Sequence, residues 1–174
     1  KKLDLMFLPL LINNQENELI YFGENPIYNN WNNYKKNYHL LNYILPNEDI
    51  DVISALNKNI DDLEDYNYEN IVKKYDSDEY IISLIYKEKE NIKIFSKIKI
   101  KDNTKIHSFE SKSIDISKLE NLDNLINRIK NIYEDNWKLN NLINRSVKLS
   151  INISVASDNY KKNMEFESFL RSNE

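Results

Sequence analysis

Several residue types that carry chemistry are absent or rare in this chain. There is no cysteine, which excludes disulfides and thiolate metal sites. The single glycine, Gly23, excludes the glycine-rich loops that cradle phosphates. The two histidines, His39 and His107, lie far apart and have no companion at metal-ligand spacing. We therefore predict no catalytic residues, no bound metal and no cofactor.

A strong charge excess and long apolar runs are also missing. The 24 basic and 28 acidic residues give a formal charge of -4, and without a basic excess a nucleic-acid surface is not expected. No apolar run approaches the ~20 residues of a membrane-spanning helix. The run 3–12 carries Asp4 and Pro9 and has no cleavage site, so it is not a signal peptide. Because the chain begins without Met, we expect an excised fragment, from which a targeting peptide upstream of Lys1 could have been removed.

The residues that are abundant set the class of the protein. Apolar residues make up 41 % of the 174, which is enough for the core of one domain, or of one domain and part of another. Asn, Ile and Lys dominate the composition, as is typical of an AT-rich bacterial genome. Asn and Asp are then expected at turn positions that glycine normally fills.

Residues 80–86 form the stretch around which the chain is organised. They are an almost unbroken run of apolar and aromatic residues, interrupted by Ser83, and they follow a helical pattern over 68–75 and a polar turn. Such a run predicts a central strand that is covered on both faces.

The segments before this strand predict a hairpin, two helices and a further strand. We expect strands over 5–12, 18–22 and 40–45, a helix over 26–36 capped by Asn25, and a short helix over 47–56. Pro9 cannot donate to a sheet, which places it near an edge or a bulge.

After the central strand, the pattern predicts a three-stranded meander and then a long helix. Isoleucine and lysine alternate over 91–100, which is typical of a half-exposed antiparallel strand, and a weaker strand follows over 105–113. Ser117 and Glu120 form a capping box for a helix that extends toward residue 143.

The last thirty residues predict a separate unit. Alternation over 147–155 predicts a strand, and Ser157 or Asp158 caps a final helix. The predicted fold class is α/β, with a mixed five- to six-stranded sheet and helices packed on its faces over residues 1–144. A βα unit over 145–174 starts a second domain.

Three acidic clusters and one aromatic segment are candidate binding features. The cluster Asp76, Asp78 and Glu79 lies at the turn before the central strand, where a divalent cation could bind; the favoured interpretation gives Asp76 and Ser77 the place of a turn glycine. The clusters at 48–51 and 61–65 are interpreted as helix-start charges and a solvated loop. Trp31, with its neighbouring tyrosines, either stacks on a ligand or belongs to the core, and the core is favoured.

Three motifs, taken in order, resemble a family of proteobacterial envelope proteins. They are Leu8-Pro9 followed by Glu24-Asn25-Pro26 and Trp31, the stretch Ile44-Leu-Pro-Asn-Glu-Asp-Ile50, and the turn Lys74-Tyr-Asp-Ser-Asp-Glu-Tyr80. This pattern is similar to that of the family named domain of unknown function 2066. Ile27, Asn47 and Asp76 replace the Trp and Gly residues of that family. The resemblance covers the chain to about Ser157. It implies a secreted, periplasmic protein of no known activity, with a core similar to the amino-terminal domain of TolB.

These observations lead to one predicted function and two alternatives. The predicted function is that of a non-catalytic envelope module that binds a protein partner. A sheet edge, or a groove formed by Trp31, Asp76, Asp78 and Glu79, is the expected binding site. The first alternative is a metal-dependent hydrolase that uses the acidic turn Asp76–Glu79. The second is a cytoplasmic structural subunit.

Overall fold

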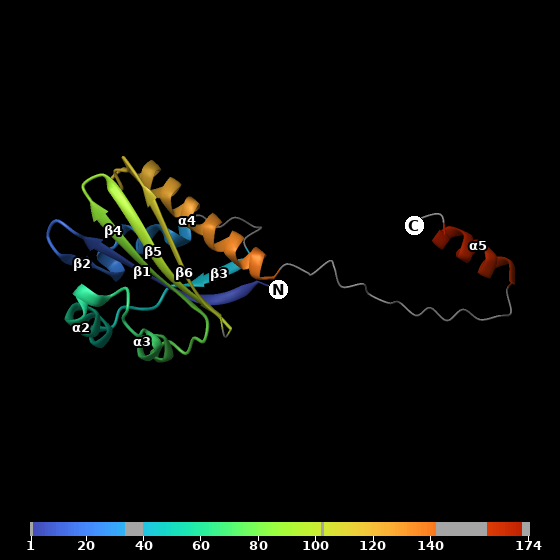
Figure 1. Cartoon of the computed structure of the whole chain (residues 1–174). Coiled ribbons are helices and arrows are strands. Elements are labelled where there is room, and N and C mark those ends of the chain that lie inside the picture. Colours follow the sequence, from blue (N-terminus) through green and yellow to red (C-terminus); the bar gives the residue numbers. More distant parts are fainter. Residues whose placement is uncertain (1, 34–39, 102, 142–159, 172–174) are drawn as a thin grey trace. The chain divides into compact units, whose positions relative to one another are not determined.

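The computed structural model describes residues 2–33, 40–101, 103–141 and 160–171 (Figure 1). The chain divides into two compact units, Lys1–Asn140 and Asn141–Glu174. The sequence predicts the division between residues 144 and 145. Each unit is described by itself.

The first unit is built on a six-stranded mixed sheet in the order β2-β1-β4-β5-β6, with β3 also paired to β1. The strands are β1 (Leu3–Asn13), β2 (Glu18–Ile20), β3 (Leu41–Ile44), β4 (Tyr80–Glu88), β5 (Asn91–Ile100) and β6 (Asn103–Ser111). Strands β1 and β4 run parallel, whereas β4, β5 and β6 form the antiparallel meander that the sequence predicts. The predicted fold class, a mixed α/β sheet with helices, is therefore confirmed.

Pro9 lies in a gap along one side of β1. Strand β3 pairs with Leu3–Met6 and β2 pairs with Leu11–Asn13, so Pro9 has a strand partner, Ser83 of β4, on the other side only. The buried side chain of Asn25 fills the gap and donates a hydrogen bond from Nδ2 to the Pro9 carbonyl oxygen at 3.0 Å. Its Oδ1 accepts from the Ile27 amide at 2.9 Å, as expected of the helix cap.

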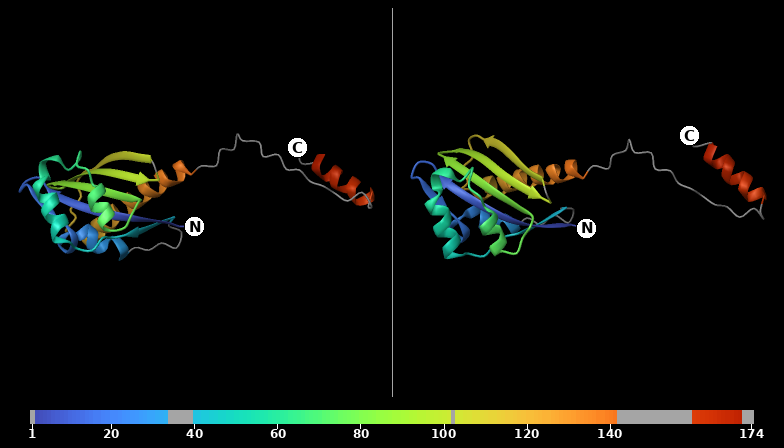
Figure 2. Two further views of the ribbon diagram at one scale, coloured as in Figure 1. Left: turned by 90° about the horizontal axis from the view of Figure 1, so that it is seen from below. Right: turned by 60° about the horizontal axis from the view of Figure 1, so that its bottom comes forward.

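Strand β4 is buried on both faces, as predicted. On one face Ile81 and Ile85 pack in a core with α1 (Pro26–Asn30) and α4 (Leu119–Asn140). On the other face Ile82 and Leu84 pack in a second core with α2 (Ile50–Lys58) and α3 (Glu69–Lys74). Figure 2 shows the helices in layers on either side of the sheet. We refer to the α4 side and the α2/α3 side of the sheet.

Two local predictions need correction. The predicted helix over 26–36 is α1 followed by a 3-10 turn, Trp31–Asn33, and residues 34–39 lie outside the described part. The capping box at Ser117 is wrong, because its hydroxyl donates to the Asp115 carboxylate at 2.6 Å and α4 begins at Leu119. The Asp115 carboxylate bends the chain before the helix instead.

The second unit contains the predicted final helix, α5 (Tyr160–Arg171). The strand predicted over 147–155 lies outside the described residues, as does His39. None of the helices in the described ranges is long and apolar enough to cross a membrane.

Candidate functional site

The acidic turn before β4 is a helix C-terminus. Asp76 has a φ of 49°, in the left-handed region, and its amide donates to the Lys73 carbonyl oxygen at 3.1 Å. The Ser77 amide reaches back to the Val72 carbonyl oxygen, which completes the pattern of a Schellman motif. Asp76 therefore stands where a glycine is normally found, as the favoured interpretation of this cluster predicts.

The hollow beside this turn is rich in lysine. It has a volume of about 490 Å³, and its charged lining residues are Glu69, Asp78, Lys73, Lys99 and Lys101. Three ammonium groups against two carboxylates disfavour a cation. Within the described residues no group of three or more His, Asp or Glu is placed to hold a metal ion. The metal-dependent hydrolase that the sequence offers as an alternative thus has no ligand set in this part of the chain.

Trp31 lies in the core on the α4 side of the sheet. Its side chain is 0 % exposed, and its ring stacks on Phe7 with 3.9 Å between the ring centroids. Its carbonyl oxygen accepts a hydrogen bond from the Lys130 ammonium of α4. The α3–β4 turn leads instead to Tyr80, which belongs to the core on the α2/α3 side. The structure thus does not bring Trp31 together with Asp76, Asp78 and Glu79, and its burial matches the core interpretation.

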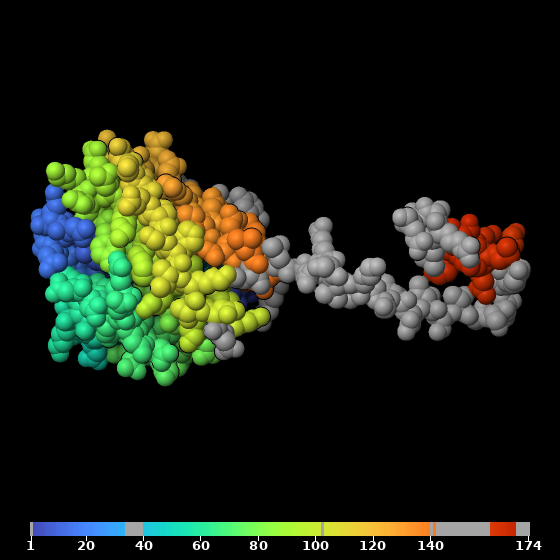
Figure 3. All heavy atoms as spheres, viewed as in Figure 1, coloured from blue at the N-terminus to red at the C-terminus, as the bar shows by residue number. Residues whose placement is uncertain are grey.

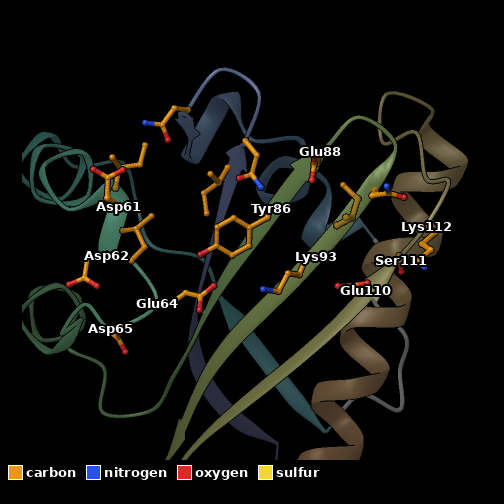
Figure 4. Close-up of a pocket in the computed structure, with 17 residues that line it drawn as sticks. Asp61, Asp62, Glu64, Asp65, Tyr86, Glu88, Lys93, Glu110, Ser111 and Lys112 are labelled. Carbon is orange, nitrogen blue, oxygen red and sulfur yellow. The ribbon is translucent and has the colours of Figure 1, made fainter.

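A larger hollow lies on the α2/α3 side, where β4 ends and β5 begins (Figure 4). Its volume is about 630 Å³, which is within the usual range for ligand pockets. We call it the acidic groove, because six carboxylates and two ammonium groups line it. The carboxylates belong to Asp61, Asp62, Glu64, Asp65, Glu88 and Glu110, and the ammonium groups to Lys93 and Lys112.

The carboxylates lie on opposite walls of the acidic groove. Asp61 and Glu64 come from the connection between α2 and α3, whereas Glu88 and Glu110 come from β4 and β6. Figure 4 shows the Tyr86 ring between the two walls, with its hydroxyl directed toward Glu64. Burial raises the pKa of the Tyr86 hydroxyl, and its hydrogen bond with the Glu64 carboxylate raises it further.

The chemistry of the acidic groove suits a positively charged ligand. Two opposed rows of carboxylates concentrate positively charged ligands, because a cleft lined by one sign of charge focuses the field. The half-buried Tyr86 ring already has a cation over it, because the Lys93 ammonium group lies 5.9 Å from the ring centroid. Of the lining residues, Ser111 is the one with an aliphatic hydroxyl, and Arg128 of α4 donates a hydrogen bond to that oxygen.

The third candidate feature is the edge of the sheet at β6. In the described part of the chain β6 pairs with β5 alone, in unbroken register from Ile92–Ser111 to Ile100–Asn103. Helices α2 and α3 cover β1 and β4. On that side β5 is partly covered, because Phe95 packs against the same core and Lys97 bonds to the α2–α3 connection, whereas the side chains of β6 are exposed. We call the side chains that β5 and β6 present there the open face: Lys93, Phe95, Lys97, Lys99, Thr104, Ile106, Ser108 and Glu110. Figure 3 shows the β6 segment, coloured yellow, exposed along the surface.

Three lysines of the open face lie over tyrosine rings. The ammonium groups of Lys93, Lys97 and Lys99 are 5.9, 5.6 and 5.9 Å from the ring centroids of Tyr86, Tyr68 and Tyr80. Their charged ends thus turn toward β4 and α3 rather than toward β6. The outer border of the open face is consequently formed by the side chains of β6 alone.

The acidic groove was not predicted from the sequence. The acidic cluster at 61–65 was visible and was interpreted as a solvated loop, which it resembles locally. The signal that the sequence did offer was the register of the predicted meander, because that register places Tyr86, Lys93 and Glu110 in one row across three strands. The position of the 61–65 segment against that row depends on tertiary packing.

Comparison with models of protein families, with curated proteins and with solved structures returns no match. The resemblance to domain of unknown function 2066 therefore rests on the sequence motifs alone.

Proposed function

We propose that this chain is a non-catalytic module that binds an extended segment of a partner protein along the edge of β6. Strand addition uses the peptide groups that an edge strand leaves unpaired, while alternate side chains give specificity. The placement in the periplasm and in the cell envelope belongs to the same proposal, and the motifs that resemble an envelope family support it.

The observation that carries the proposal is the length of β6 that the described residues leave unpaired on its outer side. Proteins usually shield sheet edges with short strands, charged side chains, prolines or bulges. Of these devices β6 has the charged side chains, Lys105 and Glu110. The strands on the other side of the sheet follow that rule, because β2 has three residues and β3 has four. Strand β6 has nine residues, no proline and no break in its register, and its Ile106 side chain is 62 % exposed.

The test begins with peptides of nine residues, selected from a displayed library against the whole 174-residue chain. Hydrogen–deuterium exchange then locates the binding site. We expect slower exchange at β6 amides, because the added strand takes up their free hydrogen-bonding positions. The variant Ile106→Lys should weaken binding about tenfold, or ~1.4 kcal/mol, because a charged residue at an edge opposes strand addition.

The matched control is Ile44→Lys, which places the same charge on β3, where Ile44 is 52 % exposed. Its affinity for the selected peptides should stay within about twofold, ~0.4 kcal/mol. Slower exchange at β2 or β3, with β6 unchanged, would contradict the proposal. So would a library that yields no binder.

A further inference from the structure

The acidic groove reaches the β6 edge through one row of paired residues. Tyr86 of β4 pairs with Lys93 of β5, and Lys93 pairs with Glu110 of β6. Directly paired residues share one face of a sheet, so all three side chains lie on the α2/α3 side. A strand added to β6 would place its next side chain beside Glu110 in this same row.

The charges of this row favour one more positively charged group, beside Glu110 at the edge of β6. Lys93 lies over the Tyr86 ring, on the β4 side of Glu110. The groove holds six carboxylates and only two ammonium groups, and Glu110 is exposed. The side of Glu110 that faces the free edge is thus open to a positively charged side chain, in a field that the other carboxylates strengthen.

A second row of the open face favours an apolar residue in the added strand, beside Ile106. Ile106 pairs with Lys97, whose ammonium group turns away to donate to the Tyr66 carbonyl oxygen at 3.2 Å. The half-buried Phe95 lies in the adjacent row of β5. Ile106 and Glu110 are four residues apart on one strand, so they point to the same face. Their partners on an added strand must also be four residues apart.

We infer that the segment bound by β6 carries Lys or Arg opposite Glu110 and an apolar residue opposite Ile106, four positions away along the segment. This inference rests on the proposed function and adds the chemical identity of the partner. In an antiparallel segment the basic residue comes first, and in a parallel segment the apolar residue comes first, because Ile106 precedes Glu110 in β6.

The experiment compares two selections from the same displayed library. One uses the natural chain and the other uses the variant Glu110→Lys. We expect peptides selected on the natural chain to carry Lys or Arg four positions from an apolar residue, and those selected on the variant to carry Asp or Glu at that position. Exchanging the peptides between the two proteins should weaken binding by about fivefold, as for an opposed cross-strand charge pair, and high salt should reduce the effect.

The matched control is Glu90→Lys, in the β4–β5 hairpin, where an exposed acid does not line the groove. This variant should select the same basic peptides as the natural chain. Peptides that protect β6 but show no preference for a basic residue would overturn the inference and leave the proposed function in place. The absence of any peptide that protects β6 would overturn both.

Discussion

Backbone positions with a positive φ, which glycine normally fills, are occupied in the described part of this chain by other residues. Among the described residues, six that are not glycine have a positive φ: Asn17, Phe22, Asp76, Lys89, Lys101 and Ser113. Lys89 and Lys101 lie in the two-residue loops of the β4–β5 and β5–β6 hairpins. Each such residue costs roughly 1 kcal/mol relative to an unstrained conformation. Scarcity of glycine therefore leaves strain at the turns that shape the sheet.

Replacing Asp76 by glycine is expected to stabilise the protein. The change Asp76→Gly relieves the left-handed strain at the end of α3 and should raise the free energy of unfolding by roughly 0.5–1 kcal/mol. Urea unfolding measures it. The matched control is Asp78→Gly, in the same turn, because Asp78 does not have a positive φ. That change should lower the free energy by a similar amount, since glycine adds freedom to the unfolded chain. A loss of stability in Asp76→Gly would mean that the carboxylate itself contributes to the turn.

Whole elements are joined by polar contacts inside the core on the α4 side. The Tyr133 hydroxyl of α4 lies 2.7 Å from Ser96 Oγ of β5 and 3.0 Å from Ser83 Oγ of β4. The two serine oxygens are 3.3 Å apart. All three residues are buried, so each hydroxyl depends on the other two for a partner. This cluster fixes the position of α4 along β4 and β5.

Removing one hydroxyl tests how firmly α4 is held. Tyr133→Phe should lower the free energy of unfolding at pH 7 by about 1 kcal/mol, because the two serines can still bond to each other. Burial raises the pKa of Tyr133 from 10.0 to about 12. The stability linked to this group is thus complete below pH 10 and is lost as the pH rises from 10 to 12.

The variant should therefore lose less stability than the natural protein over that alkaline range. Urea unfolding at pH 7, 9 and 11 provides the comparison. Some alkaline loss should remain in the variant, because burial also raises the pKa of Tyr43 and Tyr68. An equal alkaline loss in both proteins would show that the Tyr133 hydroxyl is accessible to water.

The local periodicity of the sequence predicted most helices and strands, but it could not predict which strands pair with one another. The strand predicted over 91–100 has those bounds in β5, because alternating isoleucine and lysine determine both its type and its buried face. The parallel pairing of β1 with β4, and the placement of β2 and β3 along one side of β1, depend on packing between distant segments. For the same reason Trp31 had two interpretations in the sequence, and the acidic groove had none.

At the scale of the whole molecule, the first unit has hydrophobic cores of its own on both faces of its sheet. Both cores of the described residues are built from residues that precede Lys138, and they cover the two faces of β4. Such a unit has what a domain needs to fold alone. The described part of the second unit is a twelve-residue helix with exposed Met164 and Phe169. Isolated helices of that length are only marginally stable in water.

Truncation after Asn141 is accordingly expected to leave the first unit intact. A chain of residues 1–141 should unfold in urea with a free energy within about 0.5 kcal/mol of the whole chain, since no described core residue is removed. A separate peptide of residues 142–174 should show little helix by circular dichroism, and the two results together would assign the stability to the first unit. A free energy of unfolding that is more than ~1 kcal/mol lower in the truncated chain would contradict the prediction. It would show that residues 1–141 alone do not hold the full stability of the chain.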